Sequence, residues 1–255
     1  FRRVLFRSLP VFFSLALLPA LAAPAQAQSL TAEQVVDKHL AAVGGREALS
    51  KITTRDAVGT IVVGTPMGDL AGTVDMTGKS PNKMLAAIRI DLTALGGPGE
   101  MVMNQTFDGA NGWISNSMAG DQPMVGPQLE GAKNGYFPTP LLDYKAHGMT
   151  IALEPKQKVN ERDAYVVLLT PKTGPASRLF FDAETFMLVR TTSRTVNPQT
   201  GQEVDQISEP SDYRDVGGIK VAYTLYQASG EQAITMKFSK IEHNVPVDDS
   251  VFIKK

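Results

Sequence analysis

The sequence predicts a mainly β protein, and three observations lead to that fold class. From about residue 53 onward, apolar and polar residues tend to alternate, which is typical of strands with one buried face. Turn-forming pairs such as Asp108-Gly109 and Gly217-Gly218 separate these stretches, roughly every 8–12 residues. No helical pattern intervenes between most of them. A chain with these features is expected to form an antiparallel barrel or sandwich joined by hairpins.

The predicted strands fall on either side of an irregular segment, residues 118–147. They are expected at 54–63, 69–77, 83–91, 100–107, 112–117, 149–158, 163–170, 177–182, 186–196, 203–214, 219–228 and 232–242. The chain has no internal repeat and no shift in composition that would mark a second unit. Residues 28–255 are therefore expected to form a single domain.

The clearest helical signal precedes the strands. Thr31-Ala-Glu-Gln34 has the pattern of a capping box, in which two side chains satisfy free amides at a helix start. An apolar stripe at helical spacing follows, formed by Val35, Val36, Leu40 and Val43. Gly44-Gly45 is expected to end the helix, with a second short helical turn at 46–52.

The irregular segment 118–147 contains four prolines and irregularly spaced apolar residues. Structureless loops of this length are uncommon in compact domains and often functional. We expect short helices or a long loop that serves as a lid or a packed plug. A plain surface loop is the alternative. The lid residues expected to face the interior are Tyr136, Phe137, Leu141 and Leu142.

Residues 1–27 resemble a secretory signal peptide. A basic start precedes an apolar run, Leu9–Ala23, and the small-residue exit Ala25-Gln26-Ala27 follows. The run has about 15 residues, fewer than the roughly 20 that a membrane-spanning helix needs. The chain opens with Phe1 rather than Met, so residues 1–8 carry little weight in this prediction. We expect a soluble protein exported to a bacterial periplasm.

Charge and cysteine content narrow the function further. Removing residues 1–27 takes away three arginines and no acid, which leaves 22 basic and 26 acidic residues, a net charge of −4. This balance argues against a nucleic-acid partner, which favours a basic face. The chain has no cysteine, which excludes disulfides, thiolate metal sites and a cysteine nucleophile.

Three predicted strands present one apolar face, although only the last alternates cleanly. The apolar positions are Met84, Ala86, Ile88 and Ile90; Met101, Met103 and Phe107; and Ile234, Met236 and Phe238. Methionine is frequent in or beside the strands, at Met67, Met76, Met84, Met101, Met103, Met187 and Met236. Its flexible thioether suits a cavity for variable apolar ligands, and it is equally a common filler of solid cores. Composition alone favours the filled core.

Catalytic patterns are lacking in the sequence. His39, His147 and His243 have no second histidine or acid at a metal-ligand spacing, so each is expected to be a surface or capping residue. Gly96-Gly97-Pro98-Gly99 precedes a strand rather than a helix, so it predicts a hairpin loop and not a phosphate cradle. No nucleophile elbow is present. We predict no catalytic residue, metal or cofactor. A hydrolase with an unrecognised site stays open as an alternative.

Several segments together resemble the outer-membrane lipoprotein-sorting (LolA-like) family. Ala32–Leu49 is similar to its N-terminal helix, and Phe107-Asp-Gly-Ala-Asn-Gly-Trp113 to its Asp-Gly…Trp turn. Similar later parts are Leu179–Thr185 with Leu188-Val-Arg190, Tyr213–Val221, and Ile241–Phe252. Each motif is weak alone, and their order is the more specific signal.

The resemblance implies an incomplete antiparallel β-barrel, strongly curved, with helices over its open mouth. It also implies a periplasmic carrier that shelters lipid or lipoprotein acyl chains on its concave face. The implied partners are such acyl chains, an inner-membrane releasing complex and an outer-membrane acceptor. A sensor or protein-interaction module with the same fold is the alternative. The candidate cavity residues are Met84, Ile88, Met101, Met103, Phe107, Trp113, Met236 and Phe238, with plain core as the other interpretation of Trp113.

Overall fold

The computed structural model describes most of the chain after the expected signal peptide. The described residues are 30–66, 68–93, 96–97, 99–196, 203–230 and 232–254. The predicted signal peptide, residues 1–27, and the strand-flanking Met67 lie outside them.

Two helices open the described chain. Helix α1 (Ala32–Ala42) begins at the predicted capping box: Gln34 N donates to Thr31 Oγ1 at 3.2 Å, and Thr31 N donates to Gln34 Oε1 at 2.9 Å. These two bonds satisfy amides that a helix start leaves free. After Gly44-Gly45 follows α2 (Arg46–Ser50). Both helices bury apolar side chains, namely Val35, Val36, Leu40 and Leu49.

Thirteen strands form one sheet in which every neighbouring pair is antiparallel. They are β1 (Thr54–Thr65), β2 (Gly68–Lys79), β3 (Lys83–Asp91), β4 (Glu100–Phe107), β5 (Gly112–Asn116), β6 (Gly120–Pro123), β7 (Thr150–Val159), β8 (Arg162–Thr170), β9 (Ser177–Asp182), β10 (Leu188–Val196), β11 (Glu203–Val216), β12 (Ile219–Ser229) and β13 (Gln232–His243).

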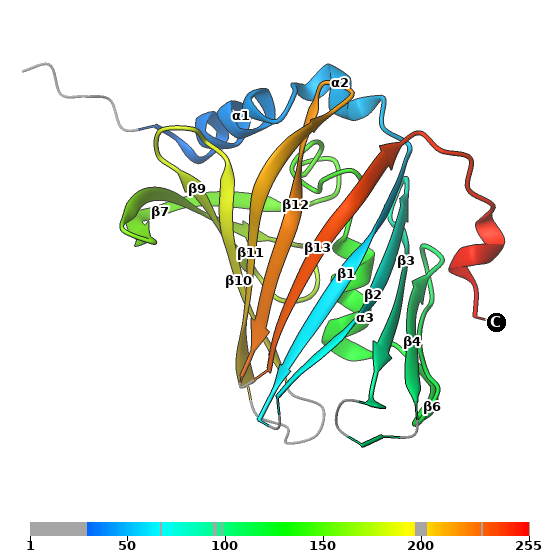
Figure 1. The fold of residues 1–255 in the computed structure, drawn as a ribbon. Coiled ribbons are helices and arrows are strands. Elements are labelled where there is room, and N and C mark those ends of the chain that lie inside the picture. The colour runs from blue at the N-terminus through cyan, green and yellow to red at the C-terminus, as the bar shows by residue number, and fades with distance from the viewer. Residues whose placement is uncertain are drawn as a thin grey trace, which may run out of the picture.

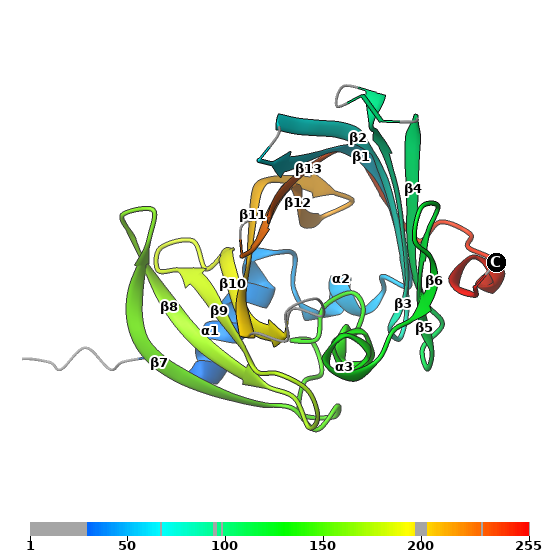
Figure 2. The ribbon, with the colours of Figure 1, turned by 90° about the horizontal axis from the view of Figure 1, so that it is seen from below.

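Strands that follow one another in the chain pair with each other, except β6 and β7, which form the two edges of the sheet. The first strand, β1, pairs with the last, β13. The sheet curves strongly and does not close (Figure 2). The predicted mainly β class, the incomplete antiparallel barrel and the N-terminal helix are therefore confirmed. Figure 1 shows α1 and α2 lying across one end of the curved sheet.

The segment predicted to be irregular, 118–147, runs through the edge strand β6 toward the other edge strand, β7. It contains β6, which the sequence reading missed, and α3 (Gly126–Asn134). All four β6 residues are exposed, so no apolar alternation marks this strand. Figure 2 shows α3 between the two arms of the sheet, opposite β12 and β13.

At two glycines the backbone of the neighbouring strand approaches closely. A Cβ atom at Gly72 would overlap the carbonyl oxygen of Arg89 on β3, and one at Gly59 would overlap that of Lys237 on β13. The register between β1 and β13 also shifts between Val58 and Gly59, as in a β-bulge. Glycines and a bulge are the features that let a sheet curve into a partial barrel.

The largest buried cluster lies where the helices meet the sheet. It joins α1, α2 and the segment 141–149 to β8, β9 and the start of β12, through side chains such as Leu40, Tyr144, Phe181 and Ile219. At the other end of the described chain, the 3-10 helix η2 (Asp249–Phe252) packs outside the sheet against β3 and β4 (Figure 2). This largest buried cluster, called the helix cluster below, holds the helices over one end of the concave face.

Candidate ligand cavity

A cavity of about 410 Å³ lies between the helices and the concave face of the sheet. Helices α1 and α2 contribute His39 and Leu49, the C-cap residue of α1 contributes Val43, and the segment after α3 contributes Phe137–Thr139. The other lining residues come from β1–β3 and β10–β13: Arg55, Ala57, Met76, Thr77, Gly78, Met84, Leu85, Leu188, Pro210, Tyr213, Ile219, Lys220, Val221, Ala222, Leu225, Phe238 and Ile241. The volume falls within the roughly 300–1,000 Å³ typical of small-molecule sites.

Strand register brings the apolar lining residues side by side. Ala57 on β1 lies opposite Met76 on β2, and Met76 lies opposite Ala86 on β3. On the other flank, Ala57 lies opposite Ile241 on β13. Directly paired residues project from the same face of a sheet, so these side chains form an apolar row across four strands.

The apolar surface continues beyond the cavity along the concave face. Met76, Leu225 and Phe238 line the cavity and also pack against a second buried cluster, formed by Ile61, Val74 and Met236. Val63, Ile88 and Ile234 extend this cluster and are only partly buried. The cavity therefore adjoins an apolar surface that the helices do not fully cover.

Seven of the eight predicted cavity residues lie on this concave face. Met84 and Phe238 line the cavity itself, and Ile88 and Met236 belong to the adjoining cluster. The others share the face by register: Met101 lies opposite Ile90, Met103 opposite Ile88, and Phe107 opposite Met84. Phe107 has no exposed surface, whereas Met101 and Met103 are partly exposed.

Solved structures of three bacterial proteins share this architecture. A LolA superfamily protein from Nitrosomonas europaea has a TM-score of 0.56 and 12% identity, over 89% of this chain and 99% of the other. A putative outer membrane lipoprotein-sorting protein domain from Vibrio parahaemolyticus has a TM-score of 0.56 and 8% identity, over 86% and 95%. The fold is LolA-like. A DUF1329 family protein from Desulfovibrio piger is similar at a TM-score of 0.55 and 12% identity, over 86% and 95%.

At identities this low the likeness concerns the fold alone. A scan against protein-family models and a search of curated proteins find no match.

Trp113, the remaining predicted cavity residue, lies on the opposite face of the LolA-like sheet. It pairs with Thr106, whose chain neighbour Phe107 faces the concave side. Its ring lies 4.4 Å from Lys254 Nζ, beyond η2 on the outside. Trp113 is thus not part of the surface that we consider for a ligand.

The four predicted lid residues belong to the helical end of the LolA-like fold. Leu141 is buried in the helix cluster, and Tyr136, Phe137 and Leu142 pack against it. Tyr136 also stacks on His147, with ring centroids 3.4 Å apart. Only Phe137 lines the cavity. These contacts resemble a packed plug more than a loose flap.

Two histidines depart from the surface or capping role predicted for them. His39 is buried in the cavity wall, and its Nδ1 donates a hydrogen bond to the carbonyl oxygen of Phe186 at 2.9 Å. Burial lowers the pKa of His39 below its ordinary value. His243 is partly buried, and its Nε2 accepts a hydrogen bond from Arg55 Nε at 3.1 Å. Tertiary packing, which the sequence pattern does not report, places both.

Arg55 is a charged lining residue that the sequence analysis did not predict. Its side chain projects from the same face of β1 as those of Ala57, Ile61 and Val63, which is the apolar face of the strand. Burial lowers the pKa of its guanidinium to about 10. The sequence signal for this residue is an arginine at a position where the alternation of the strand predicts an apolar side chain.

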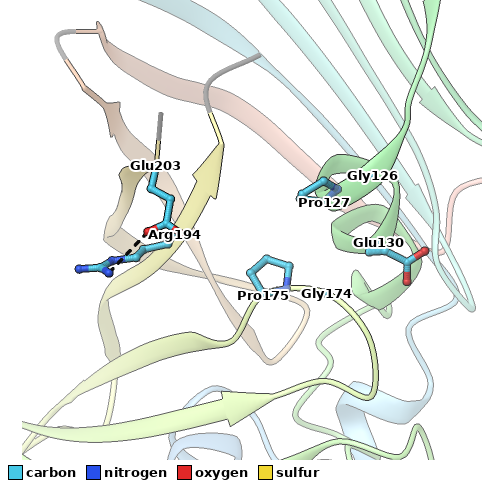
Figure 3. Close-up of a pocket in the computed structure, with 7 residues that line it drawn as sticks. All are labelled: Gly126, Pro127, Glu130, Gly174, Pro175, Arg194 and Glu203. Atoms are coloured by element: carbon cyan, nitrogen blue, oxygen red, sulfur yellow. Dashed lines mark ion pairs between the residues drawn. The ribbon is translucent and has the colours of Figure 1, made fainter. Parts of the chain in front are cut away.

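A second cavity, of about 350 Å³, lies where α3 faces the loop after β8 and strands β10 and β11 (Figure 3). Its charged side chains are already paired: Arg194 with Glu203 at 3.7 Å, and Glu130 with Lys133 at 2.9 Å. The side chains of Arg194 and Glu203 are 74% and 71% exposed. Because these charges are satisfied or solvated, we place the candidate site in the first cavity.

Two further observations concern the described residues as a whole. No group of three or more His, Asp or Glu side chains among them is arranged to hold a metal ion. No helix in that part of the chain is long and apolar enough to cross a membrane.

Proposed function

We propose that the protein binds the acyl chains of a lipid or lipoprotein in the helix-covered cavity and carries them through the periplasm. The observation that carries this proposal is an unfilled cavity of about 410 Å³ beside a partly exposed apolar sheet face. A solid core would leave neither. The flexible side chains of Met76 and Met84 on the lining suit a hydrocarbon chain of variable conformation.

The physical benefit of such a site is large. Each buried methylene contributes about 0.8 kcal/mol, so ten methylenes contribute roughly 8 kcal/mol before the entropy cost of binding. Non-covalent shelter is therefore sufficient for a chain that must later be released. This suits a carrier that needs no catalytic group.

The location and partners belong to the same proposal. The signal-peptide pattern at residues 1–27 supports export to the periplasm. A carrier there would receive its cargo from a releasing complex in the inner membrane and deliver it to an acceptor in the outer membrane, as part of outer-membrane biogenesis. The packed segment Tyr136–Leu142 would act as the plug that moves when cargo enters or leaves.

The test is binding of a fluorescent fatty-acid probe to the purified protein. Met84→Asp places a carboxylate in the cavity wall and is expected to weaken probe binding by about tenfold or more, because the charge must be desolvated when the tail is bound. The matched control is Met118→Asp, since Met118 is 63% exposed in the turn between β5 and β6. This variant should bind like the wild type.

A second variant guards against loss of folding. Ala222→Phe fills the cavity without adding charge and should also reduce binding, with circular dichroism reporting the intact sheet. Probe binding that survives both cavity changes would refute the proposed site. Native mass spectrometry of protein purified from a bacterial periplasm adds a second readout: a co-purified lipid supports the carrier, and a bound protein without lipid supports the sensor instead.

A further inference from the structure

Arg55 places a positive charge without a negative partner inside a largely apolar cavity. Among the described residues, Arg55 forms no ion pair: its contacts are the hydrogen bond to His243 and the ring of Phe137, 5.3 Å from its guanidinium carbon. The neighbouring Asp56 projects from the opposite face of β1 and accepts a hydrogen bond from Thr77 Oγ1 at 2.9 Å. Removing a charge from water is costly unless a partner of opposite charge is supplied.

His243 does not supply that negative charge. Its Nε2 accepts the Arg55 hydrogen bond, so that nitrogen carries no proton. Burial and the neighbouring Arg55 both lower the pKa of His243, which keeps the ring neutral. His243 therefore orients the guanidinium and leaves its charge in place. Two of the three guanidinium nitrogens, Nη1 and Nη2, are free of any hydrogen bond to the described residues.

The lining residues supply no negative charge near Arg55. Lys220, at the start of β12, is the other cationic side chain of the cavity, and no Asp or Glu occurs among its described lining residues. Phe137 lies over Arg55 and against Gly78, where its ring leaves no room for a Cβ atom. The cationic group thus sits at the helix-covered end, and the apolar surface of Met76, Leu225 and Phe238 leads away from it.

We propose that Arg55 binds the acidic head group of a single-chain amphiphile, a carboxylate or a phosphate, whose hydrocarbon tail lies along the concave face. The inference rests on the proposed acyl-chain binding and adds the ligand class. A guanidinium pairs with either oxyanion through two parallel hydrogen bonds, for which the two Nη atoms are available. The ligand would supply the negative charge that the protein lacks at this place.

The test compares three probes of equal chain length by isothermal titration calorimetry: dodecanoate, dodecyl phosphate and dodecan-1-ol. The wild type is expected to bind at least one anion about tenfold or more tighter than the alcohol, and the stronger anion identifies the head group. Arg55→Met should remove this preference and leave alcohol binding within about twofold. The matched control is Arg89→Met, since Arg89 is exposed, has the opposite strand parity to Ile88 and Ile90, and pairs with Glu100.

The outcomes separate this inference from the proposed function. Equal binding of all three probes by the wild type, or an unchanged preference in Arg55→Met, would overturn the role of Arg55 and leave acyl-chain binding standing. No binding of any probe would overturn both. If Arg55→Met fails to fold, the wild-type preference and Arg55→Lys decide the matter, because lysine keeps the charge but loses the two-pronged geometry and should retain only part of the preference.

Discussion

His39 illustrates how a single buried side chain links folding to pH. It lies in the cavity wall, donates to the Phe186 carbonyl and packs against the Phe181 ring at 4.8 Å between centroids. Burial disfavours the protonated ring, so the pKa of His39 is lower in the folded protein than the ordinary value of 6.5. The unfolded chain therefore takes up this proton at a higher pH than the folded protein does.

The sign of the pH dependence follows from that difference. Well above pH 6.5 His39 is neutral in both states and imposes no penalty. As the pH falls through 6.5 toward the lower folded-state pKa, the unfolded chain gains a proton that the folded protein excludes, and stability is lost. We expect His39→Asn, whose amide can replace the Nδ1 donor, to lose less free energy of unfolding between about pH 7.5 and about pH 5 than the wild type. Urea unfolding at both pH values measures this. Identical losses in the two proteins would contradict the assignment.

At the residue scale, alternation in the sequence indicates a strand face only weakly. Met84, Ile88 and Met103 share the concave face by register, although apolar residues also occur on the other face of β3 and β4. Trp113 is followed by Ile114, so both faces of β5 carry a large apolar residue and the alternation does not choose between them. Which face is concave depends on the curvature of the whole sheet.

At the scale of elements, the strands depend on glycines that allow close approach. Gly72 on β2 lies against the β3 backbone at Arg89, and its neighbours across the sheet are Ile61 and Ile90. Any side chain there must push two paired strands apart. The close approach of the β3 backbone therefore accounts for a glycine in the middle of β2.

Gly72→Val is therefore expected to destabilise the protein by about 1–3 kcal/mol, because the added methyl groups overpack the bend. Chemical denaturation would measure the change. The control is Gly131→Ala in α3, where an added Cβ meets no atom and helix propensity favours alanine. It should be neutral or stabilising by up to about 1 kcal/mol. A Gly72→Val protein as stable as the wild type would show that the bend is not constrained there.

At the scale of the whole molecule, the open sheet and its helical end enclose a space that the chain does not fill. The segment from β6 to β7 links the two free edges, and the helices α1 and α2 cover one end of the concave face (Figure 1). A ligand in that space would bind the folded state alone, since the unfolded chain has no cavity. Bound ligand should therefore raise the unfolding temperature.

Ligand removal provides the corresponding prediction. Protein stripped of lipid by a hydrophobic resin should unfold at a lower temperature than the same protein with dodecanoate added at about 100 times its dissociation constant. The expected difference is about 5–10 °C. Differential scanning calorimetry measures both samples, and Ala222→Phe, with its cavity filled, is the control that should show little shift. An equal shift in the variant would indicate binding elsewhere on the protein.

The sequence by itself determined the elements that depend on local patterns: the capped α1, twelve of the thirteen strands, and their antiparallel hairpin connections. It did not determine β6, whose exposed polar residues carry no periodicity. The open sheet was expected from the family resemblance and not from any local pattern. Only the tertiary structure decided that a cavity remains beneath the helices and that Arg55 enters it without an acidic partner. The physical reason is that a cavity and a missing counter-charge are sums over side chains far apart in the sequence, whereas alternation and capping are properties of neighbours.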